Sequence, residues 1–366
     1  MPDAIVIYGA PAGNTDLFHV VPAGIVDPFL YVEHDGRRIA TVSVLDAHEV
    51  EPHGIEILDP ALLGRDELLA ERRSPHEIEG ELALRALQRL GVERARVPFE
   101  LPAGIADPLR AGGIELTIDP EAFVERRRRK TGAQMEGIRR AQAAADAAMA
   151  RAAEMIHAGG TTAEEVRAAM QAVCEERGCE LPDDVVVAPG AQGAAGHDSG
   201  SGPLGDGEPV VVHIWPRDKA SRCWADMTRT FVAGGREPSE EIARYWELTR
   251  ESLRRIYPMV RAGADGRAIY EASCEPYHEA GLPTQLSKEP GTVLRDGFFH
   301  GLGHGVGLDI HERPGLGRGG DTLQAGDVIT LEPGCYRQGY GGVRLEDLVI
   351  VTEDGCETLT QFPYEL

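Results

Sequence analysis

Short apolar runs alternate with helical patterns over the first third of the chain, which is typical of a small α/β domain. His34-Asp35-Gly36 has the composition of a tight turn, so the runs on either side should pair as a hairpin. Ser74 followed by Pro75 marks a helix start, and this helix should continue to about Leu90. We therefore predict a first domain over residues 1–125, with strands over 4–8, 29–33, 38–42, 94–98 and 114–118.

The pattern then changes to longer helices separated by strand-rich segments, which predicts an α+β domain over residues 126–366. The basic run 126–130, between the two domains, is expected to be the solvated start of a helix. Helices are expected over 133–158, 161–178, 239–262 and 265–280. Strands are expected over 184–188, 209–215, 222–232, 327–332 and 342–352.

Composition narrows the class of protein. The 366 residues carry a formal net charge of −23, which argues against nucleic acids and anionic membranes as partners. No apolar run approaches the roughly 18 residues of a membrane span. The N-terminus lacks signal-peptide features, and the six cysteines contain no C-x-x-C pair, so we expect a reduced, cytoplasmic protein.

Three histidines fall within one glycine-rich stretch, residues 299–312. Glycines surround His304, and because glycine allows close approach of backbone and ligand, a histidine held in such a turn is a candidate metal ligand. A dinucleotide fingerprint is not supported, because Val306 stands where its third glycine belongs. The polar loop 197–201 contains histidine, aspartate and serine but no G-x-S-x-G, so a serine nucleophile has little support.

Buried acids are costly unless they are paired or bound to a cation, and three acids, Asp226, Glu332 and Glu346, lie within or at the end of predicted strands. Glu332 and Glu346 flank the turn 337–341, and His213 and Asp226 flank the turn 216–221. Because opposed residues of a hairpin bring their Cβ atoms within about 5 Å, each hairpin would present two ligands on one face. With His304, this set suits a dinuclear Mn, Co, Fe or Zn site, while ordinary strand-end salt bridges remain the alternative.

Four pieces of this domain resemble, in order and rough spacing, the catalytic domain of metallopeptidase family M24, which has the pita-bread fold. They are Asp226-Met227-Thr228-Arg229-Thr230-Phe231, Gly303-His304-Gly305 with His300 and His311, Glu332-Pro333-Gly334, and Val343-Arg344-Leu345-Glu346-Asp347. Within the family, the chain is most similar to the Xaa-Pro peptidases, prolidase and aminopeptidase P. Residues 1–125 resemble the creatinase-type N-terminal domain, so the resemblance implies an α+β pita-bread domain preceded by a smaller α/β domain.

The resemblance also implies roles for individual residues. Asp226 and Glu346 would bridge two divalent ions (Mn, Co, Zn or Fe), and His304 and Glu332 would hold one of them. Hydroxide formed between the ions would attack the carbonyl before proline, and Glu332 would carry the proton to the leaving nitrogen. The pocket would be lined by His197, His300 and His311, which stabilise the tetrahedral intermediate, and Arg344 would order the carboxylates. A cytoplasmic homodimer that acts on short proline-containing peptides is implied.

One departure concerns the aspartate that begins the family's ligand set on the strand before Asp226. His213 takes its place if the following loop carries a two-residue insertion, whereas an ungapped alignment puts Trp215 there and Asp218 lies close to the turn. The His213 imidazole could replace the carboxylate, so that two ions still bind. Alternatively, binding of the ion at this position could weaken, which would leave a one-metal enzyme. The chain could also have become a creatinase-like C–N hydrolase without metal, or a homologue with a binding role.

Overall fold

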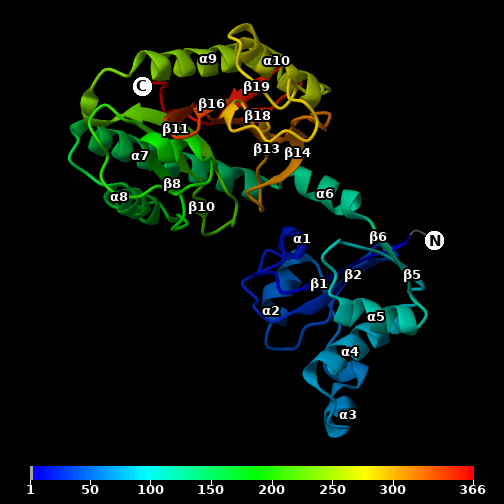
Figure 1. Cartoon of the computed structure of the whole chain (residues 1–366). Helices are drawn as coiled ribbons and strands as arrows, with labels where there is room; N and C mark the ends of the chain where they lie inside the picture. The colour runs from blue at the N-terminus through cyan, green and yellow to red at the C-terminus, as the bar shows by residue number, and fades with distance from the viewer. Residues whose placement is uncertain (1–2) are drawn as a thin grey trace. The chain divides into compact units, whose positions relative to one another are not determined.

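The computed structural model describes residues 3–366, which form two compact units divided between Arg127 and Arg128 (Figure 1). Each unit has its own strands and its own buried apolar clusters. None of the helices formed by residues 3–366 has both the length and the apolar character needed to cross a membrane.

The first unit is built on a six-stranded sheet in the order β4-β3-β2-β1-β5-β6. The predicted hairpin on either side of Asp35 is confirmed, with His34 paired to Arg37. Successive strand residues face opposite sides of a sheet, so Val6 packs in one apolar cluster and Ile7 in the other. The strands are β1 (Ala4–Gly9), β2 (Phe29–His34), β3 (Arg37–Ala40), β4 (Glu56–Ile57), β5 (Arg94–Val97) and β6 (Glu115–Ile118).

Helices cover both faces of this sheet. The longest, α4 (Pro75–Arg89), begins where predicted because Ser74 and Glu77 form a capping box that satisfies free N–H groups of the first turn. The other helices of the first unit are α1 (Thr15–Val20), α2 (Ala47–Val50), α3 (Arg65–Ala70) and α5 (Ala103–Ala111). A further helix, α6 (Pro120–Arg128), ends at the boundary between the units.

The prediction for the basic run 126–130 was wrong. The run lies at the end of α6 rather than at a helix start, and four of its five side chains are paired with acids. Arg126 donates to Glu33, Arg128 donates to Asp327 Oδ1 at 3.0 Å, and the Lys130 amine pairs with Glu312. These acids lie 93 to 199 residues away in the sequence, so the local charge pattern alone could not identify them.

In the second unit, the strands lie between two pairs of helices (Figure 1). The first pair is α7 (Gly132–Ala158) with α8 (Ala163–Glu176), and the second is α9 (Glu240–Ile256) with α10 (Gly266–Glu279). Capping boxes at Thr131 and Thr162 begin the first two helices. The alanines of α7 are small enough to bring this helix close to the strands, and many of them are fully buried.

The strands of this unit form three larger sheets, β11-β9-β8, β12-β16-β17 and β14-β13-β15-β18-β19, and the pair β10-β7. Their bounds are β7 (Cys179–Glu180), β8 (Val186–Pro189), β9 (Pro209–Ile214), β10 (Arg217–Asp218), β11 (Met227–Val232), β12 (Asp296–Gly297), β13 (Gly303–Gly305), β14 (Glu312–Leu316), β15 (Val328–Leu331), β16 (Gly334–Arg337), β17 (Gly341–Arg344), β18 (Asp347–Val351) and β19 (Cys356–Thr358).

The single strand predicted over 342–352 is two strands in the structure. β17 ends at Arg344 and β18 begins at Asp347, and the two belong to different sheets. Leu345 and Glu346 form the crossing between the sheets, and Glu346 makes an isolated bridge to Thr228 of β11. The crossing therefore brings Glu346 to the strand that follows Asp226.

Candidate functional site

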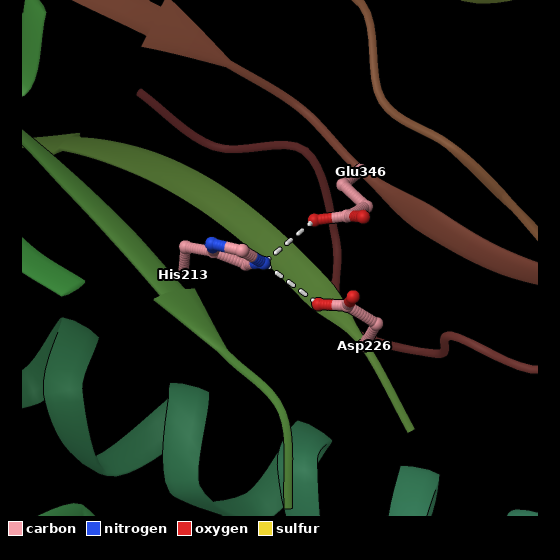
Figure 2. Close-up of side chains that lie close together, drawn as sticks. All are labelled: His213, Asp226 and Glu346. Carbon is pink, nitrogen blue, oxygen red and sulfur yellow. Dashed lines mark hydrogen bonds and ion pairs between the residues drawn. The ribbon is translucent and has the colours of Figure 1, made fainter. Parts of the chain in front are cut away.

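A buried histidine and two buried carboxylates meet between β9, β11 and the crossing at Glu346 (Figure 2). His213 Nε2 lies 2.7 Å from Asp226 Oδ1 and 3.5 Å from Glu346 Oε2. Figure 2 shows one edge of the imidazole directed toward both carboxylates. The side chains of Asp226 and Glu346 are 2% and 0% exposed, so this cluster is closed to bulk water.

Strand register explains why His213 joins this cluster. In the β9–β11 pairing His213 is opposite Thr228, and Asp226 lies two residues from Thr228 toward the turn, within diagonal reach of a long side chain. The Trp215 ring packs against the imidazole at 4.6 Å between ring centroids. Asp218 is held elsewhere, by Arg140 at 2.9 Å and by Ser221.

A second cluster combines His304, Glu332 and the same Glu346. His304 Nε2 lies 3.6 Å from Glu332 Oε1 and 3.7 Å from Asp226 Oδ2. Glu332 follows β15 directly, and the β16–β17 pairing of Gly334 with Arg344 continues toward Glu332 and Glu346. Glu346 therefore belongs to both clusters, and Asp226 lies near both histidines.

His304 lies on the short strand β13, so the prediction of a turn at this position was wrong. β13 pairs with β14 and β15, and its glycines allow the close packing. A Cβ atom at Gly303 would lie 2.0 Å from the Thr330 carbonyl oxygen, and one at Gly305 would lie 2.4 Å from that of Arg313. The glycines therefore bring His304 close to the neighbouring strands.

The hydrogen bonds of the imidazoles indicate which ring nitrogens are protonated. His304 Nδ1 lies 3.1 Å from the Gly305 carbonyl oxygen, which only accepts, so Nδ1 donates and the Nε2 lone pair faces the carboxylates. In the same way, His300 Nδ1 donates to the Gly301 carbonyl at 2.8 Å, and Nε2 accepts from the Tyr336 hydroxyl at 3.0 Å. His213 differs, because its Nδ1 has no hydrogen-bond partner among residues 3–366.

The site concentrates negative charge in a buried space. Burial raises the pKa of Asp226 to about 7, and burial together with the Asp226 carboxylate raises that of Glu346 to about 7. Burial and the Glu346 charge also raise the pKa of Glu332 well above its ordinary value. Glu346 Oε1 accepts no hydrogen bond from any residue described here. Divalent cations would pair with these acids, so the donor set fits metal ions.

The other residues predicted for the site, His197, His300, His311 and Arg344, differ in their burial and in their contacts with the two clusters. The His311 ring is 4.3 Å from His304, and His197 lies in an exposed loop. Burial, followed by the Arg344 charge, lowers the pKa of His300 to about 3, with a smaller effect from His197. Arg344 is buried and donates through Nε to the Thr228 hydroxyl at 3.0 Å.

Sequence reasoning missed two residues that support the site. The Thr228 hydroxyl donates to Glu346 Oε2 at 2.6 Å, and the Tyr336 hydroxyl donates to His300. Thr228 was identifiable in principle, because it is two residues from Asp226 and a strand repeats its face every second residue. Tyr336 had no such local signal.

Comparison with known proteins finds relatives that are named as dipeptidases. The chain is 33% identical over 239 residues to the probable dipeptidase PepE of Mycobacterium tuberculosis. This alignment covers 65% of this chain and 60% of PepE. The chain is also 33% identical over 240 residues to the Xaa-Pro dipeptidase of Pyrococcus furiosus, covering 65% and 64%. The alignments therefore span somewhat less than two thirds of these relatives.

Solved structures extend the likeness to the whole chain. The prolidase from Pyrococcus horikoshii OT3 superposes with a TM-score of 0.80 at 24% identity, covering 100% of this chain and 95% of that one. The Xaa-Pro dipeptidase from Bacillus anthracis gives 0.81 at 24% identity, covering 100% and 94%. At this identity the likeness shows the fold alone, and it confirms the predicted two-domain architecture.

The model of the family described as metallopeptidase family M24 matches residues 136–353. The matched region contains both clusters of candidate metal ligands, from His213 to Glu346. It lies within the region 126–366, where the sequence predicted a pita-bread domain. On this match and on the shared fold, the chain belongs to metallopeptidase family M24.

Proposed function

We propose that the protein hydrolyses the Xaa-Pro bond of short peptides with the help of divalent metal ions. The observation that carries this proposal is the pair of clusters that share Glu346, with one imidazole in each. His213, Asp226, His304, Glu332 and Glu346 would hold the ions. The names of the relatives, a dipeptidase and Xaa-Pro dipeptidases, support peptide bonds before proline as the substrate class.

Bound divalent ions would supply a nucleophile, because they lower the pKa of water toward neutrality. Glu332 is the acid that would move the proton to the leaving nitrogen, since its side chain is 14% exposed whereas those of Asp226 and Glu346 are buried. Imidazole N–H groups of His197 and His311 would donate to the oxyanion, while His300, whose Nδ1–H already donates to the Gly301 carbonyl, would line the pocket. Arg344 would order Glu346 through the Thr228 hydroxyl.

One observation favours a second candidate, a C–N hydrolase that works without metal, as creatinase does. His213 forms a direct 2.7 Å contact with Asp226, an imidazole–carboxylate pair that needs no cation to be stable. We rank this second, because the three closely spaced carboxylates would then keep their mutual repulsion.

The test is hydrolysis of a Xaa-Pro dipeptide and of longer Xaa-Pro peptides by manganese- or cobalt-loaded protein, with and without chelator. We expect turnover that chelator abolishes, and the ratio between dipeptide and longer peptides assigns dipeptidase or aminopeptidase. Chelator-insensitive hydrolysis of a guanidino compound would support the second candidate. No turnover by either route would contradict both and would favour a binding role.

His213→Asp is expected to strengthen binding of the second ion by at least about tenfold. His213 contributes no negative charge, and its Nδ1 lacks the carbonyl partner that orients His304, so the unchanged protein should bind one ion tightly and one weakly. Calorimetric titration with Mn²⁺ measures both steps. Trp215→Phe, which alters only the ring packed on His213, serves as the control. Two equally tight ions in the unchanged protein would contradict this prediction.

Location and assembly are also part of the proposal. All six cysteines are free, and five of them are buried, which supports a reduced cytoplasmic location. A homodimer remains a prediction from the family resemblance. Size-exclusion chromatography with light scattering measures the oligomeric state.

A further inference from the structure

The main chain at Glu346 lies outside the regular strands. Leu345 and Glu346 form the crossing between β17 and β18, which belong to different sheets. Their N–H groups donate to the carbonyls of Pro333 at 3.3 Å and of Thr228 at 3.0 Å. Since Glu346 belongs to both ligand clusters, freedom of this crossing would affect every ion that the site holds.

Arg229 contacts the crossing with a guanidinium whose five N–H groups all donate. Nη1 donates to the main-chain oxygens of Thr228 and Glu346 at 2.9 and 2.8 Å. Nη2 donates to Asp347 Oδ1 at 2.8 Å. The remaining two donors reach the carbonyls of Phe362 at 2.7 Å and Pro363 at 3.1 Å. A planar fork of five donors suits this arrangement, and a lysine amine cannot reproduce it.

The segment 361–364 encloses Arg229 from the other side. The Tyr364 ring lies 4.7 Å from the guanidinium carbon, and its hydroxyl contacts Asp347. The N–H groups of Gln361 and Phe362 donate to the Asp146 carboxylate of α7, at 3.1 and 3.3 Å. The segment is thus tied to a long helix, and it holds the guanidinium against the crossing.

We propose that Arg229, backed by the segment 361–364, is a positioning residue that holds Glu346 in the geometry needed to bind metal ions. Its contact is with the main-chain oxygen of Glu346, beside Thr228, whose hydroxyl donates to Glu346 Oε2. The inference rests on the proposed function in one respect, namely that Glu346 binds a metal ion. Groups that support metal ligands from behind affect affinity by about 10- to 100-fold.

The test is a cobalt(II) titration of the full chain, followed by visible absorption in competition with a chelator. Arg229→Lys should weaken cobalt binding by about 10- to 100-fold and alter the cobalt spectrum. Tyr364→Leu, which removes the ring and the Asp347 contact, should weaken binding by a smaller factor. Arg128→Lys is the matched control, because Arg128 is also buried and paired with an aspartate, Asp327, but should keep binding within twofold.

Thermal unfolding in chelator establishes that each variant is folded at the titration temperature. Cobalt affinities of Arg229→Lys and Tyr364→Leu within twofold of the unchanged protein would overturn the positioning role. An equal loss in Arg128→Lys would also overturn it, since general loosening would then be the cause. If Arg229→Lys does not fold, Tyr364→Leu decides. Failure of the unchanged protein to bind cobalt would instead overturn the metal-dependent function, and this inference with it.

Discussion

Glu332→Gln is expected to lower kcat for a Xaa-Pro substrate by about 10²- to 10⁴-fold at saturating metal, the range typical of a lost general acid–base group. Glutamine keeps the shape of the side chain but cannot take up and release a proton. Glu332 directly follows β15, and its side chain is partly exposed, whereas those of Asp226 and Glu346 are closed off. It is therefore the carboxylate that a substrate nitrogen can reach.

Steady-state kinetics with the metal content of each sample measured will check this result. Saturating metal is essential, because Glu332 is also a candidate ligand beside His304. Glu332→Asp is the informative companion, since it keeps a carboxylate at a shorter reach and should retain more activity. A kcat within tenfold of the unchanged protein, at full metal content, would assign proton transfer to another group.

Glu346→Gln is expected to weaken the binding of both ions by more than about 100-fold. Glu346 is common to the two clusters, so a single neutral amide removes one charged ligand from each position. The expected effect exceeds the 10- to 100-fold typical of residues that only support a ligand. The amide oxygen of the variant could still accept the Thr228 hydrogen bond, so the fold should be retained.

Metal content after equilibration with limiting Mn²⁺, together with calorimetric titration, measures this loss. Glu357→Gln is the control for charge alone, because Glu357 is exposed and pairs with Arg139. The control should bind ions as the unchanged protein does. Undiminished binding of two ions by Glu346→Gln would show that the shared carboxylate is not a ligand. The proposed set of metal ligands would then be wrong.

Local chemistry in the sequence accounts for much of the fold. Capping residues such as Ser74, Thr131 and Thr162 locate helix starts, because the first N–H groups of a helix need nearby acceptors. The turn at Asp35 locates a hairpin. The hairpin that brings Glu332 toward Glu346 was likewise predictable, since cross-strand neighbours lie at equal distances from a turn.

Other features depended on contacts between distant segments. The choice of His213 over Trp215 and Asp218 required the register of β9 against β11 and the capture of Asp218 by Arg140. The pairing of Arg128 with Asp327 spans 199 residues, and so one arginine of a basic run that looked solvated is buried.

What the sequence by itself determined is therefore the order of elements, the hairpins and the types of ligand. Only the tertiary structure decided that Arg229 donates to the main-chain oxygen of Glu346, because the chain crosses there between two sheets. Periodicity describes which face a residue takes within one element. It carries no information on how separate sheets and a distant segment such as 361–364 pack around that residue.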